Sequence, residues 1–172
     1  MEIHFDTRGN LKPYEKIELS LDRFKKHFVD DFAKEYQRRT EIFGNYWGFI
    51  EAFEQEVTKD FVQWIDGSFV TKKSVPRDID FVTLIDYQTY ERHQTIIENK
   101  FRRQAAKNAF GFVDAYVVKM YPVGHSQRWV SEYDLVYWRR WFSETRMNRM
   151  KKKYGKGFIE IRFGNANVIS DE

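Results

Sequence analysis

The chain has 172 residues, of which 42 % are hydrophobic and 18 % aromatic, and its formal net charge is +3. So high an aromatic content excludes wholesale disorder, and the absence of cysteine excludes disulfide scaffolds, zinc–thiolate sites, iron–sulfur clusters and a cysteine nucleophile. The mild positive charge permits a nucleic-acid or nucleotide partner without requiring one. No apolar run approaches the ~18 residues that span a bilayer, and the N-terminus lacks the layout of a signal peptide, so we expect no membrane contact and a cytoplasmic location.

The first third of the chain predicts an extended arm and two helices. Residues 1–17 are expected to be extended, with a turn at Gly9-Asn10. Ser20 is a suitable N-cap for a first helix. Two stripes of apolar residues at three- and four-residue steps then predict two helices with buried faces. These stripes are Leu21, Phe24, Phe28 and Phe32, followed by Ile42, Phe43, Tyr46, Trp47, Ile50, Phe53 and Val57.

The remaining two thirds alternate between strand and helix patterns. Strands are predicted at 61–65, 79–85, 112–121 and 158–163, and helices at 87–109 and 127–153. In the last helix, Trp138, Trp141, Phe142 and Met150 are the expected inward positions. The pattern predicts an α/β (α+β) fold with a small mixed sheet flanked by helices. We expect one domain over 1–172, with N-terminal helices in 1–58, a motif-bearing core in 59–125 and a C-terminal helix and strand in 126–172.

The residues that indicate chemistry lie between two predicted strands. Gly67-Ser68 follows the first strand, and Asp78-Ile79-Asp80 begins the next one ten residues later. Because side chains at i and i+2 of a strand share a face, the two carboxylates are expected to lie side by side, where they repel unless a cation separates them. Oxygen ligands of this kind suit Mg²⁺, which also binds substrate phosphates.

Other residues nearby complement this acidic pair. Glycine lets the backbone approach a phosphate, and the Ser68 hydroxyl and the following N–H groups can bind phosphate oxygens. The same loop offers three countercharges, Lys72, Lys73 and Arg77. Asp114 lies within an apolar predicted strand, where an isolated charge is costly without a partner or a metal.

This arrangement resembles a known family. Gly-Ser, then Asp-x-Asp, then an Asp on a later strand is similar to the nucleotidyltransferase superfamily with the DNA polymerase β-type fold. The short chain most resembles the minimal nucleotidyltransferase branch, common in bacteria, phage and their defence or toxin–antitoxin loci. The similarity covers roughly residues 61–121.

The resemblance implies a fold, a reaction and roles for the motif residues. The fold would be nucleotidyltransferase-like with two N-terminal helices. Asp78, Asp80 and Asp114 would hold two Mg²⁺ ions, or Mn²⁺, and Gly67 and Ser68 would bind an NTP. NMP would move to a hydroxyl of RNA, such as a tRNA 3′ end, or of a protein side chain, in a toxin–antitoxin or phage-defence setting.

Other interpretations of the same residues remain open. Asp78 and Asp80 could cap a strand and face water, Asp114 could pair with an arginine, and the loop cations could be solvated. Asp66 and Asp86 are interpreted as turn or strand-end residues. A non-catalytic antitoxin, a regulator or a nucleotide sensor of the same fold is the alternative to an enzyme.

The C-terminal part carries the densest positive patch. Its cations are a candidate RNA-contacting set or a solvated helix end, and they are Arg146, Arg149, Lys151, Lys152, Lys153 and Lys156. The aromatic content exceeds the needs of an ordinary core, so we expect an interface with a partner protein or a second copy of the chain. The four histidines are scattered, which argues against a zinc site.

Overall fold

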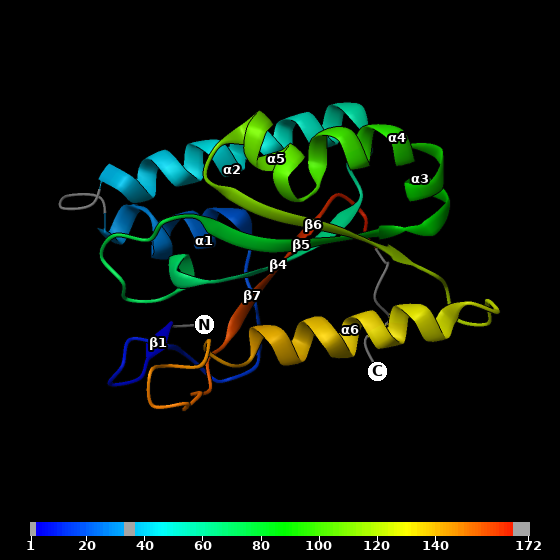
Figure 1. Ribbon diagram of the computed structural model, residues 1–172. Coiled ribbons are helices and arrows are strands. Elements are labelled where there is room, and N and C mark those ends of the chain that lie inside the picture. The colour runs from blue at the N-terminus through cyan, green and yellow to red at the C-terminus, as the bar shows by residue number, and fades with distance from the viewer. Residues whose placement is uncertain (1–2, 33–36, 167–172) are drawn as a thin grey trace.

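The structure is a computed structural model, and it describes residues 3–32 and 37–166. Helices and strands are interspersed along it, as Figure 1 shows. The strands are β1 (His4–Phe5), β2 (Leu11–Lys12), β3 (Lys16–Glu18), β4 (Phe61–Asp66), β5 (Ile79–Asp86), β6 (Val113–Met120) and β7 (Phe158–Phe163). The α-helices are α1 (Leu21–Phe28), α2 (Gln37–Glu56), α3 (Tyr87–Arg92), α4 (Gln94–Ile96), α5 (Arg103–Phe110) and α6 (Arg128–Phe142). Short 3-10 turns occupy Asp30–Phe32 and Ser68–Val70, and a π turn occupies Ile97–Phe101.

Five strands form a mixed sheet in the order β3-β7-β4-β5-β6. The pairs β3–β7 and β5–β6 are parallel, whereas β7–β4 and β4–β5 are antiparallel. The separate β1–β2 hairpin turns at Gly9, whose φ of +81° suits glycine, so the expected N-terminal turn is confirmed. The prediction of a mixed α+β fold with a small sheet and flanking helices is also confirmed.

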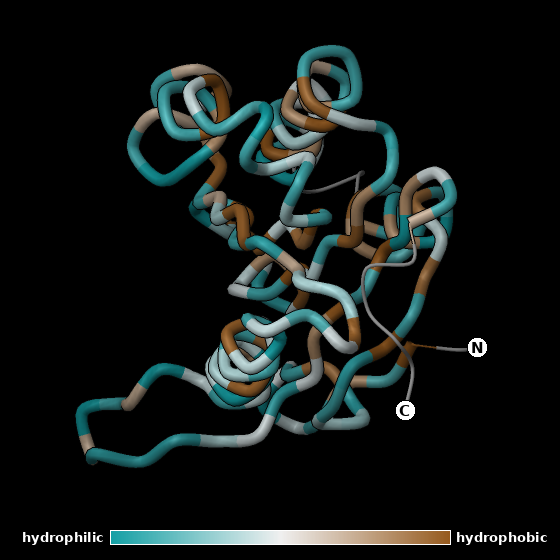
Figure 2. The backbone as a smooth tube through the Cα atoms, turned by 90° about the vertical axis from the view of Figure 1, so that its right-hand side faces the viewer, coloured by the Kyte–Doolittle hydropathy of each residue, from teal (hydrophilic) through white to brown (hydrophobic). Residues whose placement is uncertain are grey.

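The sheet lies between two helical layers. Helices α1, α2 and the α3–α5 segment cover one face, and α6 covers the other (Figure 1). Figure 2 views the layers after a 90° turn and shows hydrophobic and hydrophilic stretches alternating along the helical coils. One core cluster packs beneath α1 and α2, and a second lies under α6, where Val82, Trp138 and Phe142 are buried.

The N-terminal helices form much as their apolar spacing predicts. The Ser20 hydroxyl caps α1 by accepting a hydrogen bond from the Arg23 N–H at 3.4 Å. Phe24 and Phe28 are fully buried, as are most of the apolar residues of the second stripe. Trp47 is the exception, since 42 % of it is exposed.

The prediction of a single helix over residues 87–109 is wrong. Asp86 caps α3, and the segment then passes through α4 and a π turn before α5 begins. Ile97 and Phe101 open and close the π turn, and both are fully buried. The π turn interrupts the α-helical hydrogen-bond pattern of this segment while both side chains remain in the core.

The helix predicted over 127–153 is wrong in its second half. Helix α6 ends at Phe142, and residues 143–157 form an extended loop closed by a bridge between Glu144 and Gly155. The Asn148 side chain accepts backbone hydrogen bonds from Met150 and Lys152, each at 2.9 Å, which favours a turn over a helix. Of the four expected inward residues, Trp138 and Phe142 are buried, whereas Trp141 and Met150 are exposed.

None of the helices in the described part of the chain combines the length and the apolar composition that crossing a bilayer requires.

Candidate active site

Three aspartates form a row across neighbouring strands. Asp66 on β4 is the register partner of Asp80 on β5, and Asp80 is the register partner of Asp114 on β6. Because directly paired residues point to the same face, the three carboxylates share one face of the sheet. This is the face covered by α6. Val82 lies two residues after Asp80 on β5 and so points to the same face, and it packs in the cluster beneath that helix. We call Asp66, Asp80 and Asp114 the acid row.

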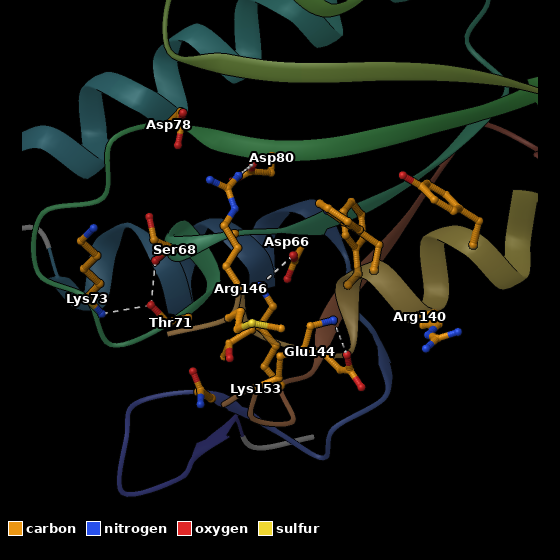
Figure 3. Close-up of a pocket in the computed structure, with 18 of the residues that line it drawn as sticks. Asp66, Ser68, Thr71, Lys73, Asp78, Asp80, Arg140, Glu144, Arg146 and Lys153 are labelled. Carbon is orange, nitrogen blue, oxygen red and sulfur yellow. Dashed lines mark hydrogen bonds and ion pairs between the residues drawn. The ribbon is translucent and has the colours of Figure 1, made fainter. Parts of the chain in front are cut away.

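Asp78 lies beside this row, in the loop immediately before β5. Figure 3 shows Asp78 and Asp80 on the sheet side of a cavity. The negative charge of Asp78 raises the pKa of both Asp80 and Asp114. The structure thus brings together the three acids that the sequence motif singles out.

The electrostatic state of the acid row reflects burial and mutual repulsion. The pKa of Asp80 is raised to about 6, first by burial and then, in order of size, by the charges of Asp78, Asp66 and Asp114. Burial also raises the pKa of Asp114, with Asp78 as the next cause. Carboxylates held in this way favour a bound cation, which relieves the repulsion.

Arg146 supplies one positive charge to the row. Its Nη2 lies 3.8 Å from Asp80 Oδ1, and 79 % of its side chain is exposed. It extends from the loop after α6 towards the sheet, as Figure 3 shows. Arg146 lowers the pKa of Asp66, Asp80 and Asp114. A side chain this exposed can move when a ligand arrives.

Asp66 and Lys156 form a buried pair that sequence analysis missed. Lys156 Nζ lies 2.7 Å from Asp66 Oδ2, and the two side chains are 10 % and 6 % exposed. The assignment of Lys156 to an exposed RNA-contacting patch is therefore wrong, because its charge is used inside the protein. Asp66 is the last residue of β4, as the strand-end interpretation expects, but its carboxylate is also buried and paired. Burial raises its pKa to about 6 against the lowering effect of Lys156, and its Oδ1 is buried without a hydrogen-bond partner.

Replacing Lys156 with methionine is expected to reduce the free energy of unfolding by about 3 kcal/mol at pH 7, because it leaves a buried carboxylate unpaired. The loss should shrink at pH 5, where Asp66 can take up a proton. Thermal melts at both pH values check this, with Lys153→Met on the same loop as the control. Equal losses at the two pH values would contradict it.

Gly67 begins the loop between β4 and β5 and places it against the acid row. Its φ is +82°, and a Cβ built there would overlap Asp80 Oδ2. Only glycine satisfies both conditions. The chain then makes a 3-10 turn over Ser68–Val70, and the Ser68 carbonyl accepts a hydrogen bond from the Thr71 hydroxyl at 2.8 Å.

Arg39 of α2 holds this loop from beneath. It is fully buried, and its guanidinium donates to the carbonyl oxygens of Phe28, Phe69, Thr71 and Lys73 at 2.7–2.8 Å. Three of these carbonyls belong to the loop that follows Gly67. No sequence signal identified Arg39, because its partners lie about 30 residues further along the chain.

A cavity of about 860 Å³ lies between the loop, the acid row, α6 and the loop 143–157. Most of the predicted residues line it, namely Gly67, Ser68, Lys73, Arg77, Asp78, Asp80, Arg146, Lys153 and Lys156. Asp114 lines an adjoining hollow of about 660 Å³, which shares Asp80 and Arg146 with the cavity.

Four further predicted residues line neither the cavity nor the adjoining hollow. Lys72 contacts the N-terminal arm, where its N–H donates to the Gly9 carbonyl at 2.9 Å. Arg149, Lys151 and Lys152 lie in the exposed part of the loop 143–157.

Comparison with known proteins gives one match. Residues 3–162 match a family of unknown function (DUF6932). The chain belongs to this family. No curated protein and no solved structure matches it. The match spans β1 through most of β7, and so includes the complete acid row of this DUF6932 protein.

The donor chemistry of the site suits a divalent cation. Carboxylate oxygens are the ligands that Mg²⁺ and Mn²⁺ prefer, and Asp66 Oδ1 is a buried acceptor without a partner. The present side-chain positions do not form a ligand set: within residues 3–32 and 37–166, no three His, Cys, Asp or Glu side chains are grouped closely enough to hold a metal. A divalent cation would gain three such ligands only if the acid side chains rotated.

Proposed function

We propose that this DUF6932 protein is a Mg²⁺-dependent nucleotidyltransferase that moves NMP from an NTP to a hydroxyl of RNA or of a protein side chain. One observation carries the proposal: Asp80 and Asp114 are register partners on adjacent parallel strands, directly beside the glycine of the Gly67-Ser68 loop. This geometry supports the interpretation of the sequence motif. A toxin–antitoxin or phage-defence setting is part of the same proposal and rests on the resemblance alone.

Different residues of the site would bind the phosphates and the metal ions of the NTP. The Ser68 hydroxyl and nearby backbone N–H groups would bind phosphate oxygens, with Lys73 and Arg77 as countercharges. Asp78, Asp80 and Asp114 would hold the two divalent ions, whose charge offsets that of the triphosphate and of the leaving group.

The transfer step needs a base and a leaving group. The acceptor oxygen bonds to the α-phosphorus while the bond from that phosphorus to the pyrophosphate oxygen breaks. The hydroxyl proton passes to the Asp114 carboxylate, which would act as the general base. Pyrophosphate leaves with the electron pair of the broken bond.

Replacing Asp80 with asparagine is expected to reduce transfer at least ~100-fold, because it removes charge where the triphosphate and its ions bind. The assay incubates the protein with each α-³²P-labelled NTP, Mg²⁺, total RNA and cell lysate, and resolves labelled RNA and protein on gels. Asp86→Asn is the matched control, since it lies on the same strand and caps α3, a role that asparagine also fills.

The other outcomes decide against the proposed mechanism or against an enzyme. Equal transfer by Asp80→Asn and wild type would remove the acid row from the mechanism. Mg²⁺-dependent NTP binding without transfer would assign a nucleotide-binding regulator instead. A protein that neither binds nor transfers would be a scaffold or an antitoxin.

A further inference from the structure

Helix α6 carries a row of aromatic side chains on its exposed side. Trp129, Tyr133, Tyr137 and Trp141 recur at four-residue steps, which places them on one face of the helix. Their exposed fractions are 67 %, 68 %, 46 % and 55 %. Successive rings are thus ~6 Å apart along the helix axis. A contiguous exposed row of large aromatics indicates a binding surface.

The aromatic row leads into the candidate active site. Tyr133, Tyr137 and Trp141 line the same cavity as Asp78 and Asp80. The rings of Tyr137 and Trp141 are stacked, with centroids 6.2 Å apart and planes inclined by 15°. A molecule lying along the rings would therefore have one end beside the acids. The helical spacing favoured core packing for Trp141 over base stacking, whereas the structure exposes Trp141 on this wall of the cavity.

Positive charges lie at the Trp141 end of the aromatic row, where α6 ends at Phe142. The loop 143–157 carries Arg146, Arg149, Lys151, Lys152 and Lys153, all exposed, against a single acid, Glu144. Arg140 of α6 also lines the cavity, and Figure 3 shows it across the cavity from Asp78 and Asp80. Stacking rings beside a run of cations are complementary to unpaired bases joined by phosphates.

We propose that the α6 aromatic row and the adjoining cations bind a single-stranded polynucleotide, with bases on the rings and phosphates on the loop 143–157. A duplex fits poorly, because its base faces are hidden by stacking. This inference deepens the proposed function and rests on it in one respect, namely that the bound strand is the acceptor whose terminal hydroxyl reaches the acid row.

The test is the binding of a fluorescein-labelled 12-nucleotide single-stranded RNA, the DNA of the same sequence and the RNA duplex, measured by fluorescence anisotropy. EDTA is present and NTP is omitted, so binding is measured apart from catalysis. Wild type is expected to bind the single strands more tightly than the duplex, with affinity falling as salt rises. Trp129→Ala combined with Tyr133→Ala should weaken single-strand binding at least ~10-fold.

Two controls isolate the aromatic row. Trp47→Ala removes an exposed tryptophan from α2, on the opposite face of the sheet, and should leave binding unchanged. Asp86→Asn, at the other end of β5 from Asp80, should also keep the affinity. Because the binding assay contains no NTP and no free Mg²⁺, a failed transfer assay and a failed binding assay are distinguishable. The RNA and DNA probes show which sugar the surface accepts.

Three results would overturn the proposal. They are the absence of binding to either single strand by folded wild type, equal affinity of the double variant, and tighter binding of the duplex. Self-association that the double variant abolishes, with no polynucleotide bound, would assign the row to a second copy of the chain instead.

Discussion

Arg39→Ala is expected to lower the free energy of unfolding by about 3–5 kcal/mol and the melting temperature by about 10 °C. The substitution removes the donors for four carbonyl oxygens, of Phe28, Phe69, Thr71 and Lys73. A buried carbonyl oxygen that loses its donor still carries the free-energy cost of desolvation, with no hydrogen bond to offset it. The guanidinium also packs over the Phe32 ring, at 4.1 Å from its centroid, so packing is lost as well.

Circular dichroism melts measure this effect, and Arg38→Ala is the matched control. Arg38 is the preceding residue on α2, partly exposed, and bonds Arg77 O and Glu41, so its loss should cost under ~1 kcal/mol. Hydrogen exchange should show faster exchange in residues 68–74 of Arg39→Ala. A melting temperature within 2 °C of wild type would show that the loop does not depend on Arg39.

Asp80→Asn is expected to stabilise the protein at pH 8 by about 2–3 kcal/mol while removing transfer activity. The pKa of Asp80 is about 6 in the fold against an ordinary value of 3.8, because the site is buried and three other acids surround it. Folding is therefore favoured when this carboxyl is protonated. The stabilisation of the fold by the protonated Asp80 carboxyl is fully present below about pH 4 and is lost as the pH rises through about 6.

The measurement is the melting temperature of both proteins between pH 4.5 and 8. The variant should exceed wild type by about 5 °C at pH 8 and differ little at pH 4.5. Mg²⁺ should raise the melting temperature of wild type more than that of the variant, since the ion would neutralise the same charge. A variant that is less stable than wild type at every pH would show that the acid row is not under repulsion.

The strands were predictable because their apolar runs are short, rich in β-branched and aromatic residues, and bounded by turn residues. The breaks in the two later helices were not. They occur at the π turn Ile97–Phe101, whose two end residues are buried in the core, and at the turn built on the Asn148 side chain. Tertiary packing and side-chain competition with the backbone both override helical periodicity.

The acids of the site were also predictable only in part. The spacing of Asp78 and Asp80 and the apolar setting of Asp114 identify three carboxylates, and the sheet register places Asp80 and Asp114 side by side. Asp66 was discounted because its partner, Lys156, lies 90 residues away in the chain. A pattern within one sequence does not reveal a pair of residues so far apart. The signal that could have identified Asp66 is its position directly before Gly67-Ser68.

The position of β7 between β3 and β4 sets the order in which the sheet can be completed during synthesis. Domains emerge from the ribosome N-terminus first, so residues 158–163 arrive after every other strand. Until then β3 lacks its only neighbour in the five-stranded sheet, and β4 presents an open edge. Lys156 emerges just ahead of β7, so Asp66 gains its counter-ion at the same stage. A nascent chain stalled before this point would display both an unpaired strand edge and an uncompensated buried acid.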